Sequence, residues 1–244
     1  MINKTVVQSI ISKYYLNTNE SVKWEIDSGN LKIDFMTPTR EVIGKVSCNN
    51  FPLEDSKLAI YDTKKLSSLI GICNGDLLLE LEKSNQVFTK LKLSDLNFNL
   101  TYALSDHLLI GKVGTVNIPE WVVELDLSED DVENLIKAKS ALSGVDNMLV
   151  TTTKNLDGED VCEFVFGDES GHNNKITYQI LGNIKEEGLK LPFNSDMFKT
   201  ILHSNKDMGG GKLTLSSMGL MGFKFESEDI NSEYFMLRKA ETEF

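Results

Sequence analysis

Cysteine, arginine and long apolar runs are all scarce in this 244-residue chain. The three cysteines, Cys48, Cys73 and Cys162, lie inside apolar patterns, and no two of them form a C-x-x-C pair. We therefore expect them to be small core residues in a reducing compartment. No apolar run approaches bilayer-spanning length, and Met1–Lys4 lacks a signal-peptide core. The composition thus predicts a cytosolic protein with no membrane partner.

Motifs that are typical of catalytic sites are also missing. The segment Gly209–Lys212 resembles a phosphate-binding loop, but Lys206 and Leu213 stand where that motif needs a glycine and a serine or threonine. The three histidines are scattered, and no serine or cysteine lies in the context of a nucleophile elbow. The sequence therefore predicts no catalysis, no metal site and no cofactor.

One acidic cluster leaves an enzyme open as an alternative. Its members are Asp157, Glu159, Asp160, Asp168, Glu169 and His172. Their spacing differs from that of the calcium-binding loop, whose ligands occupy alternate positions before a distal glutamate. Solvated hairpin tips are the simpler interpretation, whereas specific binding of a divalent metal would favour an enzyme.

Charge and length limit the remaining classes of function. The net charge is −12 and 41% of the residues are hydrophobic, which is ordinary for a folded protein of one large or two medium domains. Such acidity argues against nucleic-acid binding over the whole surface, because attraction to phosphate needs clustered cations. A local basic strip remains compatible with it.

A strand–helix–strand pattern occurs twice in the chain. The first copy, residues 57–81, has a helix start at Asp62–Thr63 and a stop at Asn74–Gly75, and the second copy spans residues 191–215 with a start at Asn194–Ser195. Four positions on the two helices match with a constant offset. They are Leu66, Leu69, Ile70 and Cys73 in the first copy, and Phe198, Ile201, Leu202 and Asn205 in the second. The duplication predicts two similar halves.

The order of elements predicts an α+β fold. Each half is expected to run helix, three or four strands, helix, three strands, and Ser128 with Asp131 resembles the start of the third helix. Two helices are too few to cover a parallel sheet of so many strands, so we expect antiparallel sheets with helices on one face. The predicted domains are 1–104 and 120–244, with a connector at 105–119 where the periodicity lapses.

Lysines occur on every predicted helix, although the chain as a whole is acidic. They are Lys4, Lys13, Lys64, Lys65, Lys137, Lys139, Lys199 and Lys206. Lys139 lies close to the apolar face of its helix and would have to snorkel. Lysine on an exposed helix is commonplace, but the chain has only two arginines, Arg40 and Arg238. Because lysine is a mobile point charge and arginine a bidentate fork, this pattern favours loose, sequence-independent contact with phosphates.

The chain resembles the DNA polymerase sliding clamps, or processivity factors, of large tailed bacteriophages, which are related in architecture to proliferating cell nuclear antigen. Three segments carry the resemblance: Leu58–Asp62 with the helix at 66–75, Glu129–Val132 with Leu135–Lys137, and Phe193–Phe244 with its Gly-Lys run, alternating strand and acidic-Phe ending. The resemblance covers essentially the full chain. The two-copy architecture carries most of its weight, since no single motif is diagnostic.

The resemblance implies a closed homotrimeric ring around double-stranded DNA, with the helices lining the hole and the lysines above facing it. An ATP-driven clamp loader would open and close the ring, and the ring, which has no active site, would tether the replicative DNA polymerase for processive synthesis. The implied location is the cytoplasm of an infected host cell, and a contact with the transcription machinery is a further implied partner.

Two surfaces follow from the same resemblance. Partner peptides would dock in an apolar pocket between the domains, and the positions carried over are Leu108, Leu109, Ile110, Phe235 and Leu237. Head-to-tail closure of the ring is expected at two edge strands, because exposed edges otherwise invite uncontrolled pairing. The interface residues expected there are Phe98, Leu100, Tyr102, Ile176, Tyr178 and Ile180.

A self-assembling β-rich phage structural protein with no DNA role is the alternative function from another class. It shares the many strands and the acidic surface. It does not predict lysines on all four helices.

Overall fold

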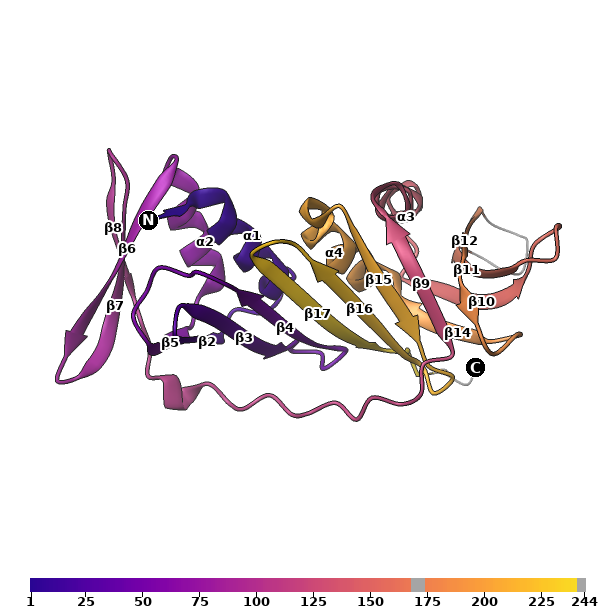
Figure 1. Cartoon of the computed structure of the whole chain (residues 1–244), viewed down its shortest axis with the longest axis horizontal. Coiled ribbons are helices and arrows are strands. Elements are labelled where there is room, and N and C mark those ends of the chain that lie inside the picture. Colours follow the sequence, from indigo (N-terminus) through magenta and orange to yellow (C-terminus); the bar gives the residue numbers. More distant parts are fainter. Residues whose placement is uncertain (168–173, 241–244) are drawn as a thin grey trace. The chain divides into compact units, whose positions relative to one another are not determined.

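Four α-helices are present in the residues that the computed structural model describes, 1–167 and 174–240. They are α1 (Lys4–Tyr15), α2 (Thr63–Ile72), α3 (Glu129–Ala141) and α4 (Ser195–Ser204) (Figure 1). Each begins after a residue whose side chain accepts a hydrogen bond from a first-turn N–H group: Asn3, Asp62, Ser128 and Asn194. The starts predicted at Asp62, Ser128 and Asn194 are confirmed, because these side chains satisfy N–H groups that have no partner inside the helix.

Two units make up the chain. The first, called here the N-terminal unit, contains Met1–Thr115 and Ser227–Ser232, and the second, the C-terminal unit, contains Val116–Glu226 and Glu233–Phe244. The division falls inside the stretch 105–119 that the sequence predicts to be a connector.

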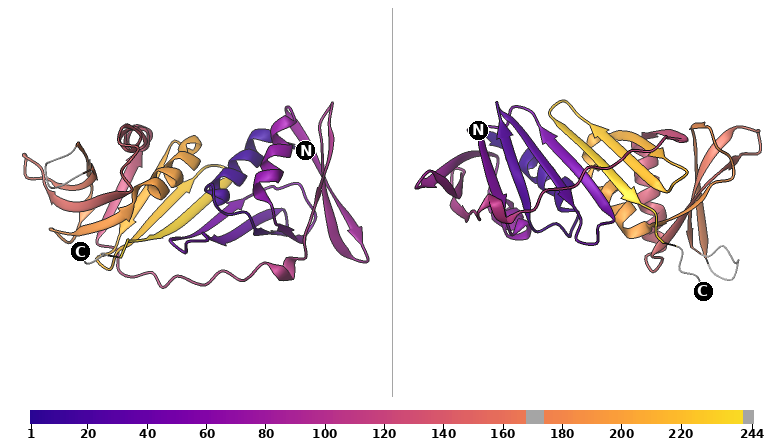
Figure 2. Two further views of the ribbon diagram at one scale, coloured as in Figure 1. Left: turned by 180° about the vertical axis from the view of Figure 1, so that it is seen from behind. Right: turned by 90° about the horizontal axis from the view of Figure 1, so that it is seen from below.

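The N-terminal unit combines α1 and α2 with two antiparallel sheets, and both helices lie on the same side of its strands (Figure 2). One sheet has the strand order β4–β3–β2–β5 and the other β1–β6–β7–β8. The strands are β1 (Ile2–Asn3), β2 (Val22–Asp27), β3 (Asn30–Met36), β4 (Val42–Cys48), β5 (Ser56–Ile60), β6 (Asp76–Ser84), β7 (Val87–Ser94) and β8 (Asn99–Ala103).

Aromatic packing fills the core of the N-terminal unit. Strand β2 alternates Val22, Trp24 and Ile26 inward, as a strand with one buried face does. The Trp24 ring meets Tyr14 of α1 edge-on at 6.4 Å between centroids, and Phe51 at 5.7 Å. Such pairs add about 0.5–1.5 kcal/mol each beyond the burial of their area. They fix α1 against the sheet.

The C-terminal unit repeats this plan with α3, α4 and two antiparallel sheets. The strand orders are β13–β9–β15–β16–β17 and β12–β11–β10–β14, with β17 belonging to this unit from Glu233 onward. The strands are β9 (Val123–Ser128), β10 (Asn147–Lys154), β11 (Asp160–Gly167), β12 (Lys175–Leu181), β13 (Asn183–Ile184), β14 (Lys190–Asn194), β15 (Gly210–Leu215), β16 (Leu220–Glu226) and β17 (Ile230–Leu237). The described residues also include two 3₁₀ turns, η1 (His107–Leu109) in the N-terminal unit and η2 (Lys206–Met208) in the C-terminal unit.

Phe198 of α4 lies at the centre of the core of the C-terminal unit. Its ring is 5.6 Å from that of Phe164, 6.5 Å from Phe166 and 5.8 Å from Phe223, measured between centroids. The helical spacing in the sequence predicts this buried position, and its relative exposure is 0%. One α4 side chain thus ties the helix to both sheets of its unit.

The cysteines are buried and unpaired, as the sequence predicts. Burial raises the pKa of the Cys48 thiol to about 11 and that of Cys162 to about 12. Since the thiolate is the reactive form, both are inert core residues. No helix within the described part of the chain has the length and apolarity needed to cross a bilayer.

Candidate nucleic-acid interface

Helix α2 presents two exposed lysines at its first turn. Asp62 caps the helix by accepting a hydrogen bond from the backbone N–H of Lys65 at 2.8 Å, and Leu66 and Ile70 are buried. Lys64 and Lys65 therefore point to solvent, and neither forms an ion pair with another residue in 1–167 or 174–240. Helix α2 contains no acidic residue, so both charges are available to an anion.

Lys4 of α1 is engaged by the neighbouring helix. Its Nζ donates to the carbonyl oxygens of Gly71 at 2.8 Å and Cys73 at 2.5 Å, at the C-terminal end of α2. A cation is favourable there because the last carbonyl groups of a helix carry partial negative charge. Two of its three donors are used in this way, which leaves a single donor for an outside ligand.

The expectation that Lys13 faces a hole is wrong. Its relative exposure is 0%, and its Nζ donates to the hydroxyl of Ser9 at 2.8 Å. Position 13 lies beside the buried Ile10, one turn earlier, and the long side chain packs under the apolar face. The sequence spacing places Lys13 at the border of that face, and packing in the fold turns its side chain inward.

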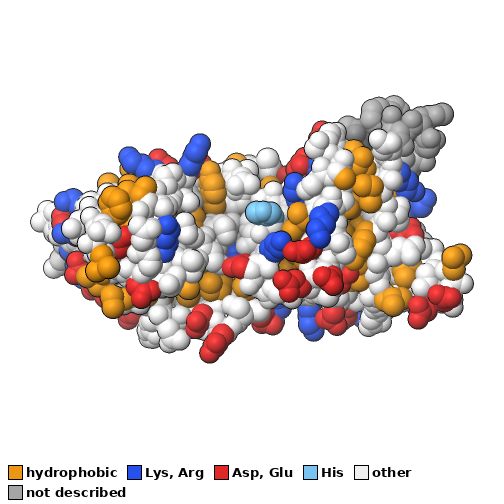
Figure 3. Space-filling model, turned by 90° about the horizontal axis from the view of Figure 1, so that it is seen from above, with side chains coloured by type: hydrophobic (Ala, Val, Ile, Leu, Met, Phe, Trp, Pro, Cys, Tyr) orange, Lys and Arg blue, Asp and Glu red, His pale blue; other side chains and the backbone are white. Residues whose placement is uncertain are grey.

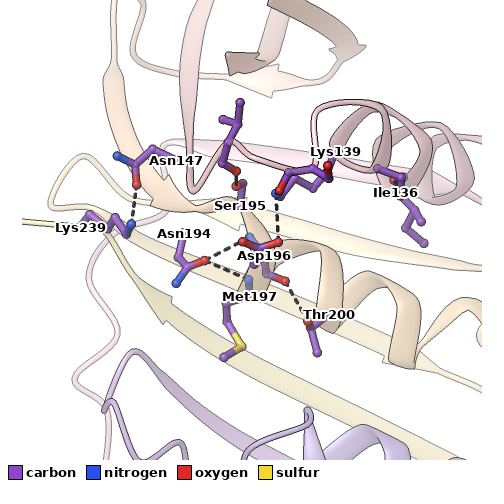
Figure 4. Close-up of polar contacts among 12 residues, drawn as sticks. Ile136, Lys139, Asn147, Asn194, Ser195, Asp196, Met197, Thr200 and Lys239 are labelled. Carbon is purple, nitrogen blue, oxygen red and sulfur yellow. Dashed lines mark hydrogen bonds and ion pairs between the residues drawn. The ribbon is translucent and has the colours of Figure 1, made fainter. Parts of the chain in front are cut away.

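Lys139 is also buried, and the expectation that it contacts DNA is wrong (Figure 4). Its side chain is 1% exposed and reaches from α3 to the first turn of α4, where its Nζ is 3.0 Å from a carboxylate oxygen of Asp196. The same Nζ donates to the carbonyl oxygen of Ser143 at 3.2 Å. A buried ammonium needs such a partner because its desolvation is costly. Lys139 therefore links α3 to α4 through an ion pair.

Lys137 and Lys206 share one carboxylate. Lys137 Nζ is 3.1 Å from Oε2 of Glu133, one turn earlier on α3, and Lys206 Nζ is 2.6 Å from Oε1. The sequence predicts Lys206 on the fourth helix. In the structure α4 ends at Ser204, and Lys206 lies in the following 3₁₀ turn, η2. Hydrogen bonds from Lys206 first and Lys137 second hold the pKa of the Glu133 carboxyl below its ordinary value. The three side chains together carry a net charge of one.

Lys199 is the remaining lysine of α4. It is half-exposed and forms no ion pair with any residue of the described ranges. His203 is exposed one turn later on the same helix. Figure 3 shows lysine side chains interspersed with acidic ones. The lysines that remain accessible without losing a partner are Lys64, Lys65 and Lys199.

A cavity in the N-terminal unit lies where the predicted connector passes its sheet. It measures about 320 Å³ and joins Leu109 and Ile110 to Met36 of β3 and Tyr61 after β5. Met36 and Tyr61 are 39% and 42% exposed, so an apolar surface is open to solvent there. Neither residue is predicted from the sequence, because the exposure of both follows from tertiary packing. A charged cavity of about 290 Å³ adjoins it, since Ile110 also lines that one.

The other residues predicted for the peptide pocket differ in exposure. Leu108 and Leu237 are exposed, at 78% and 53%. The expectation for Phe235 is wrong, because its side chain is only 4% exposed and belongs to the core. Tyr234, Phe235 and Met236 are all buried, so both faces of β17 are covered there, and the exposed end of the strand begins at Leu237.

The two strands expected to close the ring are edge strands, β8 in the N-terminal unit and β12 in the C-terminal unit. Two of the predicted interface side chains are nevertheless buried: Tyr102 at 1% and Ile180 at 6%. Tyr102 accepts hydrogen bonds at its hydroxyl from the N–H groups of Tyr61 and Asp62, which fixes the start of α2. The expectation is wrong for these two, because alternate residues of an edge strand face their own unit's helices.

The other four interface residues retain some accessible surface. Phe98 is 37% exposed, and Leu100, Ile176 and Tyr178 are half-buried. Tyr178 donates its hydroxyl hydrogen to Asp131 at 2.8 Å, which links β12 to α3. Within the described residues, β8 and β12 each have backbone N–H and C=O groups along one edge with no neighbouring strand.

The described part of the acidic cluster is a hairpin turn. The side-chain oxygen of Asn155 accepts from the N–H groups of Asp157 and Glu159, and Lys154 pairs with Asp160 at 2.5 Å. Among the residues that the structure describes, no group of acidic, histidine or cysteine side chains is arranged to hold a metal. Asp168, Glu169 and His172 lie outside the described residues.

Comparison with known proteins identifies the fold. No protein-family model and no curated protein matches the chain. Among solved structures, A. fulgidus PCNA bound to the C-terminal region of FEN-1 matches with a TM-score of 0.78 and 14% identity, over 99% of this chain and 98% of that one. Proliferating cellular nuclear antigen from Entamoeba histolytica matches with a TM-score of 0.69 and 16% identity, over 97% and 94%. The chain therefore has the PCNA-like clamp fold, and the α+β prediction is confirmed.

Proposed function

We propose that this chain is a sliding clamp, which forms a closed homotrimeric ring around double-stranded DNA and tethers a DNA polymerase for processive synthesis. The observation that carries the proposal is the PCNA-like fold over 99% of the chain. The lysines on the helices support it, because they lie on the elements that would line the hole of such a ring. A closed ring holds DNA by topology, so a few weak cation–phosphate contacts suffice and allow sliding.

Ring closure in this proposal joins the edge of β8 in one subunit to the edge of β12 in the next. Such a contact uses two different surfaces, and three head-to-tail contacts of this kind close a ring. The free backbone groups of the two edges would pair as adjacent strands do. Phe98, 37% exposed beside β8, would be covered by the junction.

The acidic charge of the chain fits this arrangement. With a net charge of −12, the outer surfaces repel DNA, while the helices present lysines. Lys64, Lys65 and Lys199 would contact phosphates directly. Because lysine binds phosphate as a point charge without fixed geometry, such contacts are independent of sequence and exchange easily between neighbouring phosphates.

Protein partners complete the proposal. The apolar surface of Leu109, Met36 and Tyr61 fits a short peptide with apolar anchors, and the comparison protein from A. fulgidus was solved with the C-terminal region of FEN-1 bound. The polymerase and an ATP-driven clamp loader would use this surface, and the transcription machinery is a third proposed user. We place the protein with the clamps of large tailed bacteriophages, acting in the cytoplasm of the infected host.

Light scattering on the purified chain tests the assembly. The proposal predicts a mass three times the 27.3 kDa of one chain. Replacing Lys137 and Lys199 by Glu should leave that mass unchanged and impair loading or processive synthesis, because the changes are confined to the proposed DNA-facing helices. A stable monomer, or normal processivity of the double variant, would contradict the proposal.

A further inference from the structure

Glu133 holds two lysines from different elements with its two oxygen atoms. Oε1 meets Lys206 of η2 at 2.6 Å, and Oε2 meets Lys137 of α3 at 3.1 Å. Both contacts are hydrogen bonds between oppositely charged groups, and the one from Lys206 is the shorter. Lys137 and Lys206 remain 68% and 49% exposed, so an outside anion can reach the same ammonium groups.

The carboxylate of Glu133 matches a phosphodiester in the features that a lysine recognises. Each group has one negative charge and two oxygen atoms that accept hydrogen bonds. A phosphate that binds Lys137 or Lys206 therefore either displaces this carboxylate or shares the ammonium group with it, against the repulsion of its negative charge. On α2, Glu20 and Asp62 accept hydrogen bonds from the backbone N–H groups of Lys64 and Lys65, but the ammonium groups form no ion pair within the described residues. A phosphate binds there without displacing one.

We infer that Glu133 is an internal competitor of DNA phosphate, which occupies Lys137 and Lys206 and so limits how tightly the C-terminal unit holds the duplex. The inference rests on the proposed function, since it names a residue that tunes the same DNA contact. In a clamp that must slide, a built-in competitor shortens the lifetime of each cation–phosphate contact. Glu133 then favours sliding along the duplex over tight binding to it.

The substitution Glu133→Gln tests this inference with the full-length chain. The probe is a short, fluorescently labelled duplex with free ends, and the readout is its anisotropy over a range of salt concentrations. Loss of the carboxylate frees two lysines, so we expect about three- to tenfold tighter binding at low salt. The slope of log affinity against log salt should steepen by about one to two, because each added phosphate contact contributes about 0.9.

Glu129→Gln is the matched control. It removes one negative charge from the first turn of the same helix, and Glu129 is exposed and forms no ion pair with the described residues. A general change of net charge would affect both variants equally, whereas release of paired lysines affects only Glu133→Gln. Adding Lys137→Ala and Lys206→Ala to Glu133→Gln should abolish the gain. Light scattering and thermal melting of each variant confirm assembly and folding.

The outcomes separate the inference from the proposed function. Tighter binding by Glu133→Gln than by Glu129→Gln, lost again in the triple variant, supports the inference. Equal affinities of the two single variants, in a protein that does bind the duplex, overturn the inference alone. Absence of duplex binding by both the natural chain and Glu133→Gln, even at low salt, contradicts the inference and the proposed function together.

Discussion

The helices of the two units share one architecture but differ in charge. Helices α1 and α2 carry four lysines and no acidic residue, whereas α3 and α4 carry five acidic residues and three lysines. Of those three, Lys137 and Lys139 are paired to carboxylates and only Lys199 is not. The clamp fold therefore fixes where the helices lie, and the side chains decide which unit attracts phosphate. Among the four helices, the exposed lysines without an ion pair are concentrated on α2.

One equivalent position on α1 and α3 also holds residues with different partners. Tyr14 on α1 and Lys139 on α3 occupy the same place relative to the N-caps of their helices. Tyr14 is fully buried in an aromatic cluster with Trp24, while Lys139 is buried in an ion pair with Asp196 of α4. An aromatic contact in one unit corresponds to an electrostatic tie in the other.

The largest expected effect of a single change concerns the two cores. Phe198 of α4 and Leu66 of α2 occupy equivalent positions, but Phe198 contacts three other phenylalanine rings. We expect Phe198→Ala to lower the free energy of unfolding by about 3–5 kcal/mol, because it leaves a cavity among those rings. Denaturant titration measures the loss, and hydrogen exchange locates it. Exchange that increases in the N-terminal unit as much as in the C-terminal unit would show that the two cores are not independent.

The ion pair between Lys139 and Asp196 gives an asymmetric prediction. Asp196→Asn leaves the ammonium of Lys139, 1% exposed, without its counter-charge and should cost about 3 kcal/mol of stability. Lys139→Met leaves Asp196, whose side chain is 63% exposed and stays hydrated, so its cost should be about 1 kcal/mol. Thermal melts of both variants check the order. A larger loss for Lys139→Met would mean that the packing of its stem, rather than the charge, holds α3 to α4.

The difference in phosphate attraction is tested by two matched pairs of substitutions. Lys64→Ala with Lys65→Ala removes two free cations and should weaken binding to a free-ended duplex about tenfold at low salt. Lys137→Ala with Lys206→Ala removes two cations that Glu133 already neutralises in part, and should weaken it less than about threefold. Fluorescence anisotropy at equal salt gives both numbers. Equal losses would refute the asymmetry between the units.

The smallest expected effect is a pH response in the N-terminal unit. Glu82 of β6 is held by Lys90 and Lys92, as Glu133 is by its two lysines, and these hydrogen bonds lower its pKa from 4.5 to about 2. Because the folded pKa is below the unfolded one, its contribution to stability is complete above pH 4.5 and is lost as the pH falls towards about 2. NMR titration of the Glu82 carboxyl carbon follows this directly. An ordinary pKa near 4.5 would show that the pair is not maintained in solution.

Local signals in the sequence predicted the elements well. The caps at Asp62, Ser128 and Asn194 and the helical spacing around Phe198 are short-range patterns, and the structure confirms them. The edge positions of β8 and β12 also agree, since both strands border segments of turn composition. Such features depend on neighbours along the chain.

Whether a lysine is exposed, buried or paired depends on partners that are distant in sequence. Lys139 is buried because Asp196 from α4 meets it, and Lys4 is engaged by carbonyl groups of α2. Periodicity alone cannot supply these contacts. The pair of Glu133 and Lys137 is the exception, because its one-turn spacing on α3 was readable from the sequence. The cavity lined by Met36 and Tyr61 could not be predicted from the sequence either, because it depends on the path of the connector.

Encirclement of DNA is tested most directly by blocking the ends of a linear duplex. A ring without a loader can reach linear DNA only over a free end, so we predict binding to an open duplex and none to the same duplex whose ends carry streptavidin before the protein is added. Streptavidin added after the protein should trap it on the DNA through a salt wash. Equal binding to open and blocked duplexes would contradict the account, because it would show that the protein holds DNA from the side.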